Sequence, residues 1–246
     1  IVLSTAYDMS ANGSYTFDAF STLSNDGIFN NNAMGTVTIN VFGINALPYA
    51  EDFETFTSGN PGTIGNGWSR NPVSGMAWMP DMGGTSSSAT GPNIDHTTGS
   101  TSGIYVYMET SSGTTGDSAF FMPPCASIAS KQLSFWYHMY GATMGTLGVQ
   151  EFVNGGWSTL WSLTGQQMTA GTDPWVEAIV LFSPTANTFR FYGVRGTSYS
   201  GDMAIDDVLI IQPLPNDASV EIAYTFGTLP LPSGTPTEVS AWVKNW

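Results

Sequence analysis

Short runs in which apolar and polar residues alternate recur along the chain, separated by Gly, Asn, Ser and Pro. A period of two residues is typical of a β-strand with one buried face, whereas helical periodicity is weak throughout. The pattern therefore predicts an all-β sandwich. The strands predicted in the central part are GIYVYMET, DSAFFMP, KQLSFWYHMYG, GTLGVQEFV, WSTLWSLTG, WVEAIVLF, TFRFYGVRG and DMAIDDVLIIQ.

The segment LSFWYHMYG, from Leu133 to Gly141, is bulky on both of its faces. Alternation places Trp136 and His138 on one face and Phe135 and Tyr137 on the other. Such a strand either lines an aromatic binding groove or is covered on both sides. We predict a central strand, with one face in the core between the sheets and the other under a long loop or neighbouring segment.

The alternation also divides the chain into three parts. Residues 1–45 end in two clean strands, Ser14 to Leu23 and Gly35 to Phe42, and are expected to be the last hairpin of a β-domain. Residues 46–213 are expected to form one complete domain, with long loops between Glu51 and about Gly103. Residues 214–246 look like the first strands of another domain. We therefore expect a piece of a longer polypeptide whose export signal lies elsewhere.

Charge narrows the functions that are open to the chain. It has 5 Lys and Arg against 19 Asp and Glu, a formal net charge of −14 at pH 7. Nucleic acids and anionic membranes are disfavoured as partners, because both require clustered basic residues. An acidic surface with few lysines is instead typical of an extracellular protein that binds divalent cations. No apolar run reaches the length of a membrane helix.

The single cysteine, Cys125, excludes an intrachain disulfide and a cysteine-based zinc cluster within this sequence. We expect it to be a free thiol that is buried or partly exposed.

The middle of the chain, about Pro48 to Gln212, resembles the MAM domain, the extracellular module named after meprin, A5 antigen and receptor tyrosine phosphatase mu. The order and spacing of several motifs carry the resemblance. They are DFE (52–54), GW (67–68), GPNIDHT (91–97), GIYVYM (103–108), LSFWYHMYG (133–141), LW (160–161), Trp175 and GDMAIDDV (201–208). Animal MAM domains carry four cysteines in disulfides, and here only Cys125 is present.

This resemblance implies a jelly-roll sandwich of two antiparallel sheets with a role in adhesion rather than catalysis. The flanking parts resemble the end and the start of immunoglobulin-like repeats in large surface proteins of gliding Bacteroidetes-type bacteria. Those proteins are similar to gliding-motility adhesins exported by the type IX secretion route. The expected location is therefore extracellular, at the cell surface.

Acidic residues at strand ends and in one loop suggest a metal site. Calcium takes six to eight oxygen ligands from carboxylates, carbonyls and water. In a jelly roll the first and last strands lie close together, so the DFE motif would lie beside AIDDV with the NIDHT loop over both. The alternative is that these acids accept hydrogen bonds from backbone N–H groups. The residues expected at the site are Glu54, Asp95, Asp206, Asp207 and the carbonyl region of Gly103.

The resemblance implies that a cation at this place stiffens the ends of the sandwich. Because Asp206 and Asp207 would point to opposite faces of a regular strand, Asp206 is the preferred ligand of the two. A pair of catalytic carboxylates is the rival interpretation, and it predicts hydrolysis that is lost when Glu54 or Asp206 is substituted.

Aromatic residues and histidines are the remaining candidates for a site. Most tryptophans are expected in the core, but Trp78 and Trp157 have Gly and Met as neighbours and are candidates for ligand contact. The two histidines, His96 and His138, are expected to be hydrogen-bonded structural residues, since they are too few for a histidine zinc site.

These observations predict a non-catalytic adhesion module, stabilised by calcium, in a long, repetitive, secreted surface protein. The expected partners are a surface polysaccharide or a protein ligand, and the neighbouring domains of the same chain. The alternative is a carbohydrate-binding module attached to a secreted polysaccharide hydrolase or peptidase.

Overall fold

The computed structural model describes residues 13–19, 33, 35–41, 43–44, 46–126, 128–213, 218–224 and 240–245. The chain divides into two compact units, residues 1–211 and residues 212–246. In the described ranges the structure has strands, turns and loops, and no helix long and apolar enough to cross a membrane.

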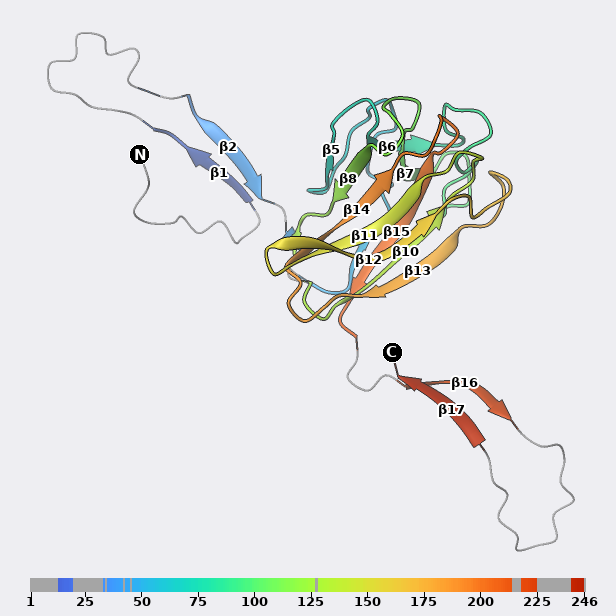
Figure 1. Ribbon diagram of the computed structural model, residues 1–246. Coiled ribbons are helices and arrows are strands. Elements are labelled where there is room, and N and C mark those ends of the chain that lie inside the picture. Colours follow the sequence, from blue (N-terminus) through green and yellow to red (C-terminus); the bar gives the residue numbers. More distant parts are fainter. Residues whose placement is uncertain are drawn as a thin grey trace, which may run out of the picture. The chain divides into compact units, whose positions relative to one another are not determined.

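The central part is a sandwich of two antiparallel sheets (Figure 1), as the alternating pattern predicts. One sheet has six strands and the order β13-β10-β15-β7-β6, with β4 also paired to β15. Its strands are β4 (Tyr49–Glu51), β6 (Trp78–Met82), β7 (Ile104–Met108), β10 (Gln132–His138), β13 (Val176–Leu181) and β15 (Met203–Ile211).

The second sheet has five strands in the order β12-β11-β14-β8-β5. These are β5 (Ser69–Asn71), β8 (Ser118–Met122), β11 (Thr146–Val153), β12 (Gly156–Thr164) and β14 (Thr188–Val194). A short parallel pair, β3 (Gly43–Ile44) and β9 (Cys125–Ala126), lies outside both sheets. The expected all-β jelly-roll class is confirmed.

The core between the sheets is rich in aromatic side chains. Phe135 of β10 lies edge-on to Phe191 of β14, with ring centres 4.9 Å apart. Trp68 stacks on Phe121 at 4.6 Å. Burial of such side chains is the main stabilising contribution that a sandwich of this size has available.

A second, smaller apolar layer covers the other side of the six-stranded sheet. Tyr105, Tyr107, Trp175 and Met79 are buried there, with Trp136 packed against them. The indole N–H of Trp175 donates to the carbonyl oxygen of Ile94 at 3.1 Å, which ties the loop between β6 and β7 to this layer. The prediction that LSFWYHMYG is a central strand covered on both faces is therefore confirmed.

The flanking parts each contain one antiparallel pair of strands. β1 (Gly13–Phe17) pairs with β2 (Val37–Val41), in agreement with the hairpin predicted for the first part of the chain. β16 (Ala218–Tyr224) pairs with β17 (Ser240–Asn245). Most of the remaining residues of both flanks lie outside the described ranges, and the assignment of the flanks to immunoglobulin-like domains stays a prediction.

His138 yields a test of this arrangement. Its ring is buried and lies edge-on to Trp175, with ring centres 5.5 Å apart, and neither ring nitrogen makes a hydrogen bond among the described residues. The expected hydrogen bond of His138 is therefore not confirmed. Burial lowers the pKa of His138 from 6.5 to about 4, and nearby Asp173 opposes this only in part. The unfolded chain therefore binds a proton that the folded chain does not bind between these pH values.

We predict that His138 makes the free energy of unfolding fall as the pH falls from about 6.5 to about 4, by roughly 3 kcal/mol. The raised pKa values of buried Asp202 and Asp206 change the free energy of unfolding in the opposite direction. Both acids are present in the wild type and in His138→Leu, so their effect cancels when the two proteins are compared. Urea unfolding of both proteins at a series of pH values isolates the histidine. Parallel pH profiles for the two proteins would refute the prediction.

Candidate functional site

The candidate site lies where the start and the end of the sandwich meet. β4 pairs with β15, with Glu51 opposite Val208, so the DFE turn that follows β4 lies near the AIDDV segment. The loop between β6 and β7 contacts the AIDDV segment, and the first residue of β7 contacts the DFE turn, through the hydrogen bonds described below. The structure thus brings together the three segments that the sequence analysis selected.

Glu54, Asp95 and Gly103 form the first group of this site. Glu54 accepts a hydrogen bond from the backbone N–H of Ile104 at 2.9 Å. A Cβ atom at Gly103 would lie 2.2 Å from the carboxyl carbon of Asp95, so this carboxylate packs directly on the glycine. Glycine is required here because it lacks a side chain, not because of its backbone conformation.

The two carboxylates of this group differ in their electrostatics. Burial raises the pKa of Glu54, and the negative charge of Asp95 raises it further. Burial also acts to raise the pKa of Asp95, but hydrogen bonds from Thr98 and Ser100 outweigh it, so its pKa is lowered. The backbone N–H groups of Thr98 and Ser100 lie 2.6 and 3.0 Å from the Asp95 oxygens. Asp95 is therefore held ionised while facing a second acid.

Asp206 belongs to a second group and is fully buried. One oxygen accepts from the backbone N–H of His96 at 2.8 Å and the other from that of Asp207 at 2.8 Å. Burial raises the pKa of Asp206 to about 8; the His96 N–H opposes the rise and the charge of Asp207 adds to it. This is the alternative that the sequence analysis left open for these acids, in which backbone N–H groups satisfy the carboxylate.

Asp207 holds the side chains of the same loop. Its carboxylate contacts the Nδ1 atom of His96 and accepts from the hydroxyl of Thr97 at 2.8 Å. The ring of His96 stacks on Trp136, with ring centres 3.8 Å apart. The expectation that His96 is a hydrogen-bonded structural residue is confirmed.

The expectation that Asp206 and Asp207 point to opposite faces is wrong. The register of β15 against β10 shifts by one residue in this region, and Asp207 has a left-handed φ of 45°. A bulge of this kind inserts one extra residue and interrupts the alternation of side chains. The carboxylates of Asp206 and Asp207 therefore both reach the loop. The five predicted residues therefore form two groups, and in the described ranges no three His, Cys, Asp or Glu side chains form a metal-binding cluster.

Pattern analysis missed Glu51 and Asn66 beside this site. The Asn66 amide donates to both oxygens of buried Glu51, at 3.2 and 3.0 Å. Both residues line a cavity of about 400 Å³, together with Asp52 and Asp207. The only sequence signal was the acidic run EDFE, which does not indicate which of its carboxylates is buried.

The two predicted ligand-binding tryptophans differ in environment. Trp78 is fully buried in the core, and its indole N–H donates to the carbonyl oxygen of Ala119 at 3.1 Å. The prediction that Trp78 contacts a ligand is wrong, because the inter-sheet core covers its ring. Trp157 is 36% exposed on β12, so its assignment stays a prediction.

We predict that Gly103→Ala destabilises the protein by about 1–3 kcal/mol, because the Asp95 carboxylate must move away from its backbone donors. Gly84→Ala is the matched control in the same loop, since its Cβ would meet no heavy atom closer than 3.8 Å. Urea unfolding compares the two variants with the wild type. Equal stability of both variants would contradict the packing of Asp95 on Gly103.

The sequence model of the MAM domain, meprin/A5/mu, matches residues 52–214. Thyroid hormone-induced protein B of Xenopus laevis is 35% identical over 158 residues, which are 62% of this chain and 22% of that protein. MAM domain-containing glycosylphosphatidylinositol anchor protein 2 of Rattus norvegicus is 38% identical over 153 residues, which are 54% of this chain and 16% of that protein. The chain thus spans less than a quarter of the length of either relative.

Among solved structures, the K1 cleaved adhesin domain of Lys-gingipain from Porphyromonas gingivalis W83 has a TM-score of 0.47 at 14% identity, covering 69% of this chain and 100% of that domain. A family 29 carbohydrate-binding module from Piromyces equi has a TM-score of 0.38 at 7% identity, covering 67% and 91%. Because the MAM model matches more than half of its residues, the chain belongs to the MAM domain family, whose members are extracellular modules of the adhesion type.

Proposed function

We propose that this chain is a non-catalytic adhesion module of a long, repetitive, secreted bacterial surface protein. Membership of the MAM family over residues 52–214 is the observation that carries the proposal. The arrangement of the acids supports it, because Asp206 and Asp207 bind the 95–98 loop. Carboxylates used in this way hold loops in place and are not free to act as a catalytic acid and base.

The gliding-adhesin context and the type IX secretion route rest on the pattern of the flanking parts. The parent reading frame tests this directly. Repeats of the same β-domains around the MAM domain would support the proposal. A hydrolase or peptidase domain in the same reading frame would overturn it in favour of a binding module attached to an enzyme.

Adhesion itself is tested with coated microspheres. Beads carrying the full 246-residue chain are expected to attach several-fold more strongly to polysaccharide and protein surfaces than beads carrying albumin. A chain unfolded by Phe135→Asp is the matched control, because Phe135 is fully buried in the core. Attachment that does not exceed the albumin level on any surface would contradict an adhesive role.

A structural calcium ion is the second part of the proposal. Glu54 and Asp95 lie close enough to repel each other, and their carboxylates are the hard oxygen ligands that calcium takes. A cation bound there would offset the repulsion and join the DFE turn to the 95–103 loop, with backbone carbonyl groups near Gly103 completing the ligands. The sequence analysis also expected Asp206 and Asp207 at the calcium site. They would support the site by holding the 95–98 loop.

Calcium at this site is expected to raise the melting temperature by several degrees, since a ligand at 100 times its Kd adds about 2.7 kcal/mol. Thermal unfolding is measured in EDTA and after calcium is restored, for the wild type, Glu54→Gln and Asp95→Asn. Both variants should lose the response. Asp117→Asn is the control, because Asp117 also accepts hydrogen bonds from a threonine but lies on an exposed loop. A wild-type melting curve indifferent to both EDTA and calcium would rule out the ion.

A further inference from the structure

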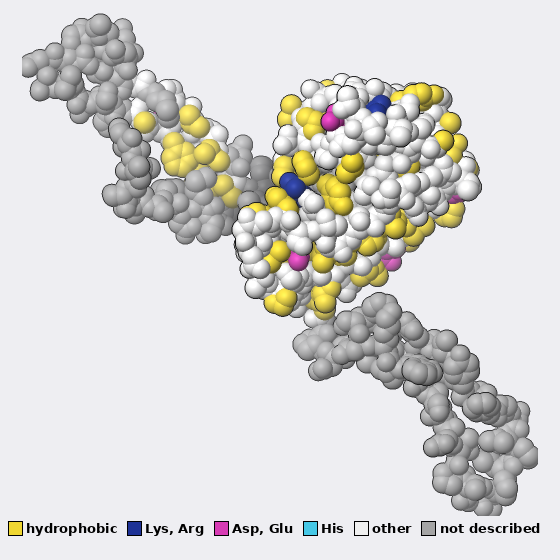
Figure 2. Space-filling model, in the orientation of Figure 1, with side chains coloured by type: hydrophobic (Ala, Val, Ile, Leu, Met, Phe, Trp, Pro, Cys, Tyr) yellow, Lys and Arg dark blue, Asp and Glu magenta, His cyan; other side chains and the backbone are white. Residues whose placement is uncertain are grey.

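The outer face of the five-stranded sheet carries aromatic and amide side chains. In β14, Phe189 and Phe191 are buried in the core, so the intervening Arg190 and the following Tyr192 point outward. In β11 the same alternation turns Gln150 outward. Figure 2 shows hydrophobic side chains beside a Lys or Arg side chain over β8 and β14, with Asp and Glu only as isolated spots. The solvent-facing side of a sheet is ordinarily polar, so an aromatic one requires an explanation.

Arg190 is held between two aromatic rings. Its guanidinium carbon lies 3.8 Å from the ring centre of Phe120 and 4.0 Å from that of Trp157. Its Nε atom donates to the side-chain oxygen of Gln150 at 2.8 Å. These four side chains come from four different strands, β8, β11, β12 and β14, and fix one another in place.

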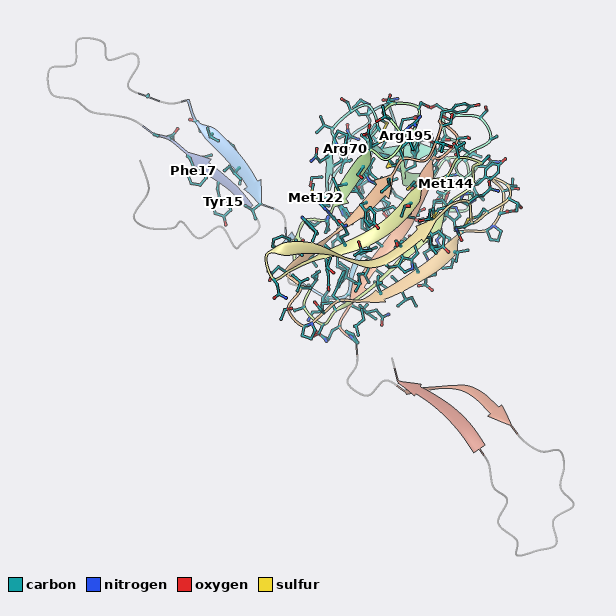
Figure 3. All side chains as sticks on the ribbon, in the orientation of Figure 1. Tyr15, Phe17, Arg70, Met122, Met144 and Arg195 are labelled. Atoms are coloured by element: carbon teal, nitrogen blue, oxygen red, sulfur yellow. The ribbon has the colours of Figure 1, made fainter. Side chains whose placement is uncertain are left out.

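The remaining donors of Arg190 are free to bind a ligand. Within the described part of the chain, its Nη1 and Nη2 atoms make no hydrogen bond and its guanidinium group makes no salt bridge to an acid. The other two arginines, Arg70 and Arg195, are labelled in Figure 3. Both donate to main-chain carbonyl oxygens. A guanidinium group fixed by two rings and an amide loses little conformational entropy when it binds a partner.

Tyr192 extends this surface over β11. A Cβ atom at Gly148, its partner in the ladder, would lie 2.4–2.7 Å from the Cε1, Cζ and Oη atoms of the tyrosine. The ring therefore lies across the main chain of β11 where only glycine leaves room. The result is a low, partly exposed aromatic surface next to Arg190 and Gln150.

We propose that this face, formed by Trp157, Arg190, Gln150 and Tyr192, binds a neutral polysaccharide of pyranose sugars. The C–H faces of pyranose rings pack on aromatic side chains, and guanidinium and amide groups bind the ring hydroxyls. The net charge of −14 repels polyanionic chains and so favours a neutral one. This inference rests on the proposed adhesive function and names the class of ligand that the module contacts.

The simpler interpretation is that the stacked side chains of Phe120, Arg190 and Trp157 cover the sheet and have no other role. That interpretation predicts that substitutions there change stability and leave binding unaffected. The sugar-binding interpretation predicts loss of binding in variants that remain folded. The two are therefore separated by measuring both quantities on the same proteins.

Affinity gel electrophoresis of the full chain in gels containing barley β-glucan, hydroxyethylcellulose, glucomannan, galactomannan or neutral xylan tests the proposal. Retardation is expected in at least one of these gels. Trp157→Ala and Arg190→Gln should each weaken it roughly tenfold, while thermal unfolding confirms the fold of each variant. Tyr199→Ala is the control, because Tyr199 is an aromatic residue that is 49% exposed on a separate loop. If Trp157→Ala fails to fold, Arg190→Gln alone decides the outcome.

Parallel gels contain the polyanions polygalacturonate or alginate. Three results would overturn the proposal: no retardation in any neutral gel, retardation that both variants retain, and retardation only in the polyanion gels. The microsphere assay separates this failure from failure of the adhesive function. If beads carrying Trp157→Ala attach as strongly as beads carrying the wild type, the proposed sugar-binding face is refuted and the adhesive function still stands.

Discussion

The pairing of β15 with three other strands is the constraint on which the rest of the domain depends. β15 hydrogen-bonds to β10, β7 and β4, so residues near the start, the middle and the end of the domain form a single sheet. These contacts are distant in sequence, and closing such loops costs entropy that only extensive packing recovers. The buried aromatic core between the sheets supplies that packing.

Carboxylates hold the long loops of a chain that has a single cysteine. Asp206 binds backbone N–H groups of the loop at His96, and Asp95 binds those of Thr98 and Ser100 within it. Asp202 does the same for Thr110, and Asp173 for Thr169. Hydrogen bonds lower the pKa values of Asp95 and Asp173, so these two acids accept as charged groups, and such hydrogen bonds are stronger than those to neutral acceptors. This use of acids accounts for part of the excess of Asp and Glu over Lys and Arg.

The two outer faces of the sandwich differ in a way that bears on function. The outer face of the six-stranded sheet is covered in part by the 83–103 loop, with His96 stacked on Trp136 and Trp175 bonded to Ile94. On the outer face of the five-stranded sheet, Arg190 lies between the rings of Phe120 and Trp157. The 83–103 loop is therefore held on one face, and the other face carries the side chains of Phe120, Arg190 and Trp157.

The sequence by itself determined the all-β class, eight of the eleven strands in the two sheets and the doubly covered position of LSFWYHMYG, because period-two alternation follows directly from strand geometry. It did not predict the short strands β4, β5 and β6, which lie in or beside the stretch that was expected to form long loops. It also selected the segments that meet at the candidate site. Only the tertiary structure decided which side chains converge there. The bulge at Asp207 turned two acids toward one loop, the core buried Trp78, and the registry of β14 against β11 placed Tyr192 over Gly148. Each of these depends on contacts between strands that are distant in sequence, about which a local pattern contains no information.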